Sequence, residues 1–121
     1  MNILCCGDRN WTCYATIHSR LTQYRNTDVT IIHGNARGAD RIAAKAGIDL
    51  GLSIKSFPAQ WKIYGRGAGP IRNQQMLDEG KPDLVLAFHD DIRNSKGTKD
   101  MVERAKRAGI KTEVISSIGS N

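Results

Sequence analysis

Apolar stretches of strand-like composition alternate along the chain with stretches in which apolar residues recur every three or four positions. Strands are predicted over residues 2–6, 29–33, 53–57, 83–88 and 111–115, and helices over residues 14–25, 39–50, 70–80 and 98–108. Strands that alternate with helices favour a parallel sheet with helices on both faces. We therefore expect an α/β fold: a Rossmann-like three-layer α/β/α domain with a mostly parallel five-stranded sheet.

The rest of the pattern predicts how the chain is divided. Residues 59–70 are expected to be irregular, because Gly65, Gly67 and Gly69 alternate before Pro70. The sequence contains no repeat and no low-complexity segment. Residues 1–116 are therefore predicted to form a single domain, and residues 117–121 a flexible tail.

Composition narrows the class of protein. The 121 residues are 40% hydrophobic, enough for one core. Since no run of 18 apolar residues occurs and the N-terminus has no basic segment, we expect neither a membrane span nor a signal peptide. Cys5 and Cys6 point to opposite faces of one predicted strand, and Cys13 stands apart. These features are typical of reduced thiols in a cytoplasmic protein.

Charge and histidine spacing add little that is specific. The formal net charge is +6, from 18 Lys and Arg against 12 Asp and Glu, and the basic residues are scattered. Such a balance is compatible with a nucleic acid, with an anionic small ligand or with a solvated basic surface. His18, His33 and His89 match no metal-ligand spacing, so structural or exposed histidines are favoured. We expect no metal and no cofactor.

The candidate chemistry lies where predicted strands end. In sheets of this kind ligands bind beyond the carboxyl ends of the strands, and residues 7–11, 33–40 and 89–98 each follow a strand. The central stretch is 31–40, in which a β-branched run meets a turn bracketed by Gly34 and Gly38, and a helix follows. Strand, glycine turn and helix direct backbone N–H groups at an anion. This stretch is predicted to cradle a phosphate, although a small-residue turn also closes a strand–helix corner without a ligand.

The candidate ligand-binding residues fall into four motifs. They are Gly7, Asp8, Arg9 and Trp11; Gly34, Asn35, Ala36, Arg37, Gly38 and Asp40; Arg72 and Asn73; and Ser95, Lys96, Gly97 and Thr98. The central turn matches neither G-x-G-x-x-G nor a P-loop. Arg37 strengthens the phosphate interpretation, because a guanidinium can bind phosphate through two hydrogen bonds beside a helix N-terminus.

Each motif also has an explanation that needs no ligand. Asp8 and Arg9 can form a local ion pair, and Trp11 can pack on the core instead of stacking on a base. Asp40 can offset the helix dipole instead of contacting a ribose hydroxyl. In the last motif, the hydroxyl of Ser95 or Thr98 can be an ordinary N-cap.

The chain resembles the SLOG superfamily in four motifs taken in order: G-D-R at 7–9, H-G-N-A-R-G-A-D at 33–40, G-P-I-R-N-Q-Q-M at 69–76 and S-K-G-T at 95–98. The most similar branch is the small YspA-type, YpsA-related group of bacteria and phages. The superfamily also contains the DNA-processing protein DprA and the Lonely Guy phosphoribohydrolases. The resemblance, over residues 2–115, implies a Rossmann-like domain that binds nucleotides or derivatives such as ADP-ribose, and a homo-oligomer.

The sequence departs from the Lonely Guy enzymes at the catalytic glutamate. Those enzymes cleave the base–ribose bond with an arginine and the glutamate of P-G-G-x-G-T-x-x-E. Arg72 takes the place of the arginine and Gly97-Thr98 that of the glycine-threonine pair, but Met101 stands at the glutamate position. Asp100 would lie about 100° away around the helix. Arg72 and Asp100 would be the catalytic pair of an enzyme, yet methionine cannot stabilise an oxocarbenium-like centre.

The leading hypothesis is therefore binding without hydrolysis. The ligand would be a nucleotide or a nucleotide-derived signal, ADP-ribose-like or cyclic, and the protein a sensor or a sequestering protein. The alternative is an N-glycosidic hydrolase of nucleoside monophosphates that uses Arg72 with Asp100 or Asp8. A second alternative is DprA-like binding of single-stranded DNA, which the scattered charge and the few aromatic residues make less favoured. Backbone N–H groups and arginines recognise phosphates, so the base of the ligand does not follow from the sequence.

Overall fold

A computed structural model describes residues 1–117 of the chain. The strands are β1 (Asn2–Gly7), β2 (Thr30–His33), β3 (Ser53–Ser56), β4 (Leu84–Phe88) and β5 (Lys111–Ile115). The α-helices are α1 (Tyr14–Leu21), α2 (Ala39–Asp49), α3 (Trp61–Tyr64), α4 (Ala68–Gly80) and α5 (Gly97–Arg107). Short 3₁₀ turns are η1 (Thr22–Tyr24), η2 (Gly65–Gly67) and η3 (Ile92–Asn94). Every predicted strand and helix is present, with ends close to those expected.

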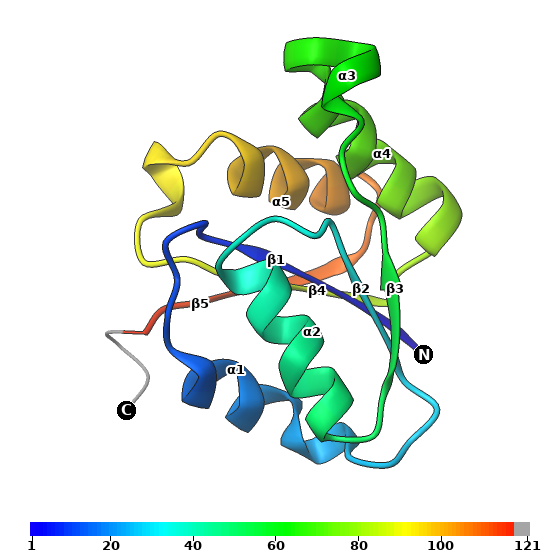
Figure 1. Cartoon of the computed structure of the whole chain (residues 1–121), viewed down its shortest axis with the longest axis vertical. Helices are drawn as coiled ribbons and strands as arrows, with labels where there is room; N and C mark the ends of the chain where they lie inside the picture. Colours follow the sequence, from blue (N-terminus) through cyan, green and yellow to red (C-terminus); the bar gives the residue numbers. More distant parts are fainter. Residues whose placement is uncertain (118–121) are drawn as a thin grey trace.

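The five strands form one sheet in the order β3-β2-β1-β4-β5. All four pairings are parallel, so the sheet is parallel throughout. Leu4 of β1 lies between Ile32 of β2 and Val85 of β4. The strand order reverses between β1 and β4, and in such sheets this reversal opens a crevice at the carboxyl edge. The predicted Rossmann-like α/β fold is confirmed, and Figure 1 shows helices on both sides of the sheet.

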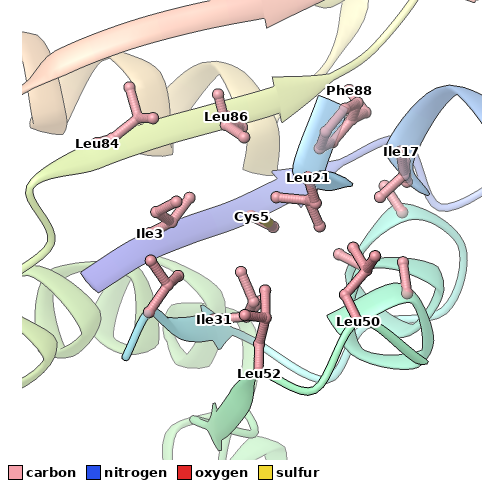
Figure 2. Packing of buried hydrophobic residues seen from close by; sticks show 14 of the residues in the cluster. Ile3, Cys5, Ile17, Leu21, Ile31, Leu50, Leu52, Leu84, Leu86 and Phe88 are labelled. Atoms are coloured by element: carbon pink, nitrogen blue, oxygen red, sulfur yellow. The ribbon is translucent and has the colours of Figure 1, made fainter. Parts of the chain in front are cut away.

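Alternate side chains of the strands build two separate cores. Ile3 and Cys5 point toward α1 and α2, where Figure 2 shows them with Leu21 and other apolar residues. Leu4 and Cys6 point the other way, toward α4 and α5. This alternation is the period of two that a strand imposes, and it separates the two adjacent cysteines as predicted. All three cysteines are free thiols.

Residues 59–70 differ from the prediction of an irregular segment. The carbonyl of Gln60 accepts hydrogen bonds from the N–H groups of Ile63 and Tyr64, each at 3.0 Å, and this closes the single turn of α3. Gly65 then leaves the helix with φ of +55°, a conformation that glycine adopts readily. A one-turn helix presents no apolar stripe to a core, so hydrophobic periodicity could not reveal it. Pro70 lies in the first turn of α4, as predicted.

The end of the chain is described as far as Ser117. Its N–H and hydroxyl groups donate to the carboxylate of Asp90, both at 2.7 Å. The other residues of the predicted flexible tail, 118–121, lie outside the described part of the chain. Within residues 1–117, no helix is long and apolar enough to cross a bilayer.

Candidate ligand site at the carboxyl edge of the sheet

The loops that follow β1 and β2 contact each other through their backbones. The N–H of Ala39, the first residue of α2, donates to the carbonyl of Asp8 at 3.0 Å. Gly38 has φ of +79°, and a Cβ there would lie 2.3 Å from the carbonyl oxygen of Asp8. A Cβ on Gly7 would lie 2.2 Å from the carbonyl oxygen of Phe88, at the end of β4. Both glycines are therefore required by close approach, and the predicted first and second motifs do meet.

The backbone N–H groups of the turn after β2 donate hydrogen bonds to nearby side chains of the same chain segment. The Asp40 carboxylate accepts hydrogen bonds from the N–H groups of Gly34, at 2.9 Å, and of Ala36, at 3.5 Å. The N–H of Asn35 donates to Nδ1 of His33 at 2.9 Å. Three successive donors of the predicted cradle are thus already occupied. The role of Asp40 in this structure is to hold the turn, and its side chain is buried.

Burial controls the ionisation of both acceptors. It raises the pKa of Asp40 to about 6, against the opposing effects of the Gly34 N–H and of nearby Arg72 and Arg41. Burial also lowers the pKa of His33, and the positive charges of Arg41 and Arg72 lower it further. His33 is therefore neutral at pH 7, in agreement with an Nδ1 atom that accepts a hydrogen bond.

Two arginines approach this turn from different helices. Nη1 of Arg72, on α4, donates to the carbonyl of Gly34 at 2.6 Å, and Nε donates to the side-chain oxygen of Asn73 at 3.0 Å. A Cβ on Gly34 would lie 2.2 Å from the same Nη1, so this glycine makes room for the guanidinium. Nε of Arg41, on α2, donates to the carbonyl of Asn35 at 3.3 Å.

Arg41 and His33 were absent from the predicted site, although Arg41 carries a signal in the sequence. It lies in the first turn of α2, where a cation opposes the helix dipole. A positive charge that is unfavourable in the first turn of a helix indicates a role other than stabilising that helix. His33 carries no comparable signal, because its contact with the Asn35 N–H depends on the conformation of the turn.

The first motif and Arg37 of the second have a mixed outcome. Arg9 and Arg37 are exposed, and Nη2 of Arg37 donates to the side-chain oxygen of Asn10 at 3.3 Å. Asp8 accepts the N–H of Asn10 at 2.9 Å, and no ion pair joins it to Arg9 within residues 1–117. Trp11 belongs to the core. Only 5% of it is exposed, its ring packs edge-on against Phe88, and its N–H donates to a backbone carbonyl, so it offers no open face to a base.

The third and fourth motifs meet between α4 and α5. The buried Asn73 side chain donates to the carbonyl of Gly97 at 3.2 Å and to the carboxylate of Asp100 at 2.9 Å. The same carboxylate oxygen accepts Nε of Arg104 at 2.8 Å. Met101 is buried in the core beneath α5. Asp100 thus joins the two helices, and position 101 holds a buried apolar side chain instead of a carboxylate.

The N-terminus of α5 is capped from within the chain. Oγ of Ser95 accepts the N–H groups of Thr98, at 3.0 Å, and of Lys99, at 3.2 Å. Lys96 and Gly97 are exposed, and a Cβ on Gly97 would meet no atom within 4 Å. The N-cap interpretation is therefore the one that the hydrogen bonds support, with Ser95 as the capping residue. In the described part of the chain, no group of three or more His, Cys, Asp or Glu side chains is arranged to hold a metal ion.

Comparison with known proteins identifies relatives in sequence and in fold. The model of the YspA, cpYpsA-related SLOG family matches residues 1–64. The Gene 61 protein of Mycobacterium phage D29 is 31% identical over 116 residues, which cover 89% of this chain and 90% of the phage protein. The X-ray structure of DNA processing protein A (DprA) from Streptococcus pneumoniae superposes with a TM-score of 0.78 at 15% identity. The match covers 98% of this chain and 52% of the DprA chain, so this chain spans about half the length of DprA.

Proposed function

The chain belongs to the YspA, cpYpsA-related SLOG family, and we propose that it binds a nucleotide or nucleotide-derived ligand at the carboxyl edge of its sheet. The ligand would be of the ADP-ribose or cyclic nucleotide type. Its phosphate would lie at the start of α2, and the protein would act in the cytoplasm as a sensor or a sequestering protein.

One observation carries the proposal: Arg41 and Arg72 converge on the turn after β2 without an acidic partner at its surface. Arg72 donates to the carbonyl of Gly34 and Arg41 to the carbonyl of Asn35, so both guanidinium groups lie at the same turn. Neither arginine forms an ion pair within residues 1–117, and Asp40 is buried beneath the turn. A bound phosphate would supply the missing negative charge, through contacts that arginine makes well.

The N-terminus of α2 provides further donors for the same anion. The N–H of Ala39 is bonded to Asp8, but those of Gly38, Asp40 and Arg41 have no hydrogen-bond partner among the described residues. No side chain caps this helix. Unpartnered N–H groups at a helix start, with the positive end of the helix dipole, favour an anion.

Binding without cleavage is supported by the side chains at the position of the catalytic glutamate and next to it. Met101 is buried and apolar. The Asp100 carboxylate accepts hydrogen bonds from Asn73 and Arg104, so it is held between two helices. An N-glycosidic hydrolase would need a carboxylate free to face the ribose carbon. If the protein were nevertheless such an enzyme, incubation with AMP would release adenine, and Arg72→Ala would abolish the release.

Isothermal titration calorimetry tests the proposal with AMP, ADP, ADP-ribose and cyclic ADP-ribose as probes. We expect at least one to bind, and we expect Arg37→Gln and Arg41→Gln each to weaken that binding by about tenfold or more, as loss of a charge-assisted contact does. Arg25→Gln is the matched control, because Arg25 is exposed and lies before β2, at the amino edge of the sheet. The proposal fails if the folded protein binds no probe, or if Arg25→Gln weakens binding equally.

A further inference from the structure

A groove of about 460 Å³ lies between α4 and the segment that joins β3 to α4. Gln75 and Glu79 line it from α4, and Pro58 and Tyr64 line it from the joining segment. Figure 1 shows α3, which ends at Tyr64, beside the N-terminal end of α4. Of the candidate ligand-binding residues described above, Arg72 alone borders this groove. Its volume is in the range of small-molecule sites, and the phosphate contacts leave it unused.

Arg72 connects the groove with the proposed phosphate position. Its Nη1 donates to the carbonyl of Gly34 at 2.6 Å, and Arg41 donates to the carbonyl of the next residue at 3.3 Å. The N–H of Phe57 donates to the carbonyl of His33 at 2.8 Å, so the segment that leads to α3 starts beside the end of β2. The groove therefore begins next to the turn on which the two arginines converge.

Two polar side chains of the groove have no hydrogen-bond partner. The Gln75 amide is half-buried and the Glu79 carboxylate is exposed, and neither side chain forms a hydrogen bond or an ion pair within residues 1–117. Gln74 and Asp78 also line the groove, but Nε2 of Gln74 donates to Asp78 at 3.0 Å. An amide offers a donor and an acceptor, and a carboxylate offers acceptors. Positions 75 and 79 are one helical turn apart, so both side chains can contact one ligand.

An exposed aromatic ring and an aliphatic side chain complete the lining of the groove. Tyr64 is 48% exposed and Ile71 is 45% exposed. An aromatic ring can stack on any base, because every base has a π-face. The groove thus combines a surface for the face of a flat heterocycle with hydrogen-bonding groups for its edge.

We propose that this groove holds the base of the ligand, and that its residues select adenine. The base would stack on Tyr64. The Gln75 amide would donate to a ring nitrogen and accept from the amino group, which is how a glutamine recognises adenine, and Glu79 would accept the second amino hydrogen. A carbonyl at the same position, as in hypoxanthine, cannot donate to Glu79 and would place its oxygen against a carboxylate. This inference rests on the proposed function, and it assigns the base that the phosphate contacts leave open.

Isothermal titration calorimetry of the full chain with matched probes tests the base site. AMP and IMP differ in the group at C6, as do ADP-ribose and IDP-ribose, and ribose 5-phosphate has no base. In the pair that binds, we expect the adenine compound to bind at least about tenfold more tightly than the hypoxanthine compound and than ribose 5-phosphate. Equal binding of the two bases overturns the proposal.

The base site and the phosphate site fail in different ways. If ribose 5-phosphate binds as tightly as AMP and ADP-ribose do, and Arg41→Gln weakens the binding of all three, the base site is wrong and the phosphate site stands. If the folded protein binds none of the probes, the proposed function is wrong, and the base site is wrong with it.

Glu79→Gln tests the contact with the edge of the base. We expect this variant to reduce the preference for adenine over hypoxanthine by about fivefold or more, because an amide can donate to a carbonyl. Binding of ribose 5-phosphate should not change. Glu103→Gln is the matched control, since Glu103 is exposed on α5, forms no ion pair within residues 1–117 and does not line the groove. An unchanged preference in Glu79→Gln, or an equal change in Glu103→Gln, overturns the role of Glu79.

Two substitutions of Tyr64 test the stacking contact. Tyr64→Ala should weaken the binding of AMP or ADP-ribose by about tenfold or more, whereas Tyr64→Phe should retain it, because stacking needs the ring and not the hydroxyl. Neither variant should change the binding of ribose 5-phosphate, and circular dichroism checks that both are folded. A folded Tyr64→Ala protein that binds the adenine compounds as tightly as wild type overturns the placement of the base in this groove.

Discussion

The N-termini of α2 and α5 look alike in the sequence, yet they differ in what their backbone donors contact. Both follow a strand at the carboxyl edge of the sheet, and both have a glycine at their start, Gly38 just before α2 and Gly97 as the first residue of α5. At α5, Ser95 accepts two N–H groups of the helix. At α2, no side chain caps the helix, and the nearby carboxylate of Asp40 instead accepts N–H groups of the preceding turn. The start of α5 is thus capped by its own chain, whereas the N–H groups of Asp40 and Arg41 at the start of α2 have no partner among the described residues.

This difference shows that a glycine turn before a helix does not by itself make an anion site. Whether a helix start can bind an anion depends on which of its N–H groups already have acceptors. In the turn after β2, the donors of residues 34–36 are occupied, and the unpartnered ones lie further along the chain, around Gly38 and Arg41. The proposed phosphate position therefore moves from the turn to the beginning of α2.

The largest expected effect comes from the glycines of the two helix starts. Gly38→Ala should reduce the free energy of unfolding by more than about 3 kcal/mol, because it combines positive φ with a Cβ 2.3 Å from a backbone oxygen. Gly97→Ala should change it by less than about 0.5 kcal/mol, since a Cβ there meets no atom within 4 Å. Urea unfolding followed by circular dichroism measures both. Equal effects would contradict the contrast between the two helix starts.

The second effect is a pH dependence of stability that Asp40 introduces. Its pKa of about 6 in the folded protein exceeds the ordinary value of 3.8, so the folded state holds the proton more tightly. The stabilisation is complete below pH 3.8 and is lost as pH rises through about 6. Asp40→Asn should remove this loss, which is roughly 3 kcal/mol for a shift of about two pKa units.

The measurement is the free energy of unfolding at several pH values between 4 and 7, for wild type and Asp40→Asn. Only the difference between the two curves is informative. His33 has a lowered pKa, so in both proteins it adds stability as pH rises, and in wild type it opposes the effect of Asp40. Parallel curves would show that Asp40 is not the buried acid that the structure describes.

The smallest expected effect is the loss of the cap on α5. Ser95→Ala should lower the free energy of unfolding by about 1 kcal/mol, because the N–H groups of Thr98 and Lys99 lose their acceptor. Ser19→Ala is the control, since Ser19 is an exposed residue of α1, and it should cause no loss. Denaturant midpoints at constant slope measure the difference. A Ser95→Ala protein as stable as wild type would remove the distinction between the two helix starts.

Much of the location of the candidate site could be predicted from the sequence, but few of the hydrogen bonds between its residues could. The loops at the carboxyl edge follow from the alternation of strands and helices, and Arg72 belongs to one of the four motifs that the sequence indicates. The contact of Arg72 with the Gly34 carbonyl joins residues 38 positions apart. The bond between Asn73 and Asp100 likewise joins two different helices. No local pattern encodes such pairs, so the sequence could not show that Asp100 is held between α4 and α5.

The sequence by itself determined the elements of this protein, their order and the two faces of each strand. Strand and helix periods are local properties, and burial of apolar residues enforces them, which is why Ile3 and Leu4 lie on opposite sides of the sheet. Only the tertiary structure decided which polar groups remain available. In the tertiary structure Trp11 is buried, Ser95 caps the N-terminus of α5, and apolar residues of α3 are exposed. Hydrogen-bond partners and exposure depend on neighbours in space, and packing alone brings those neighbours together.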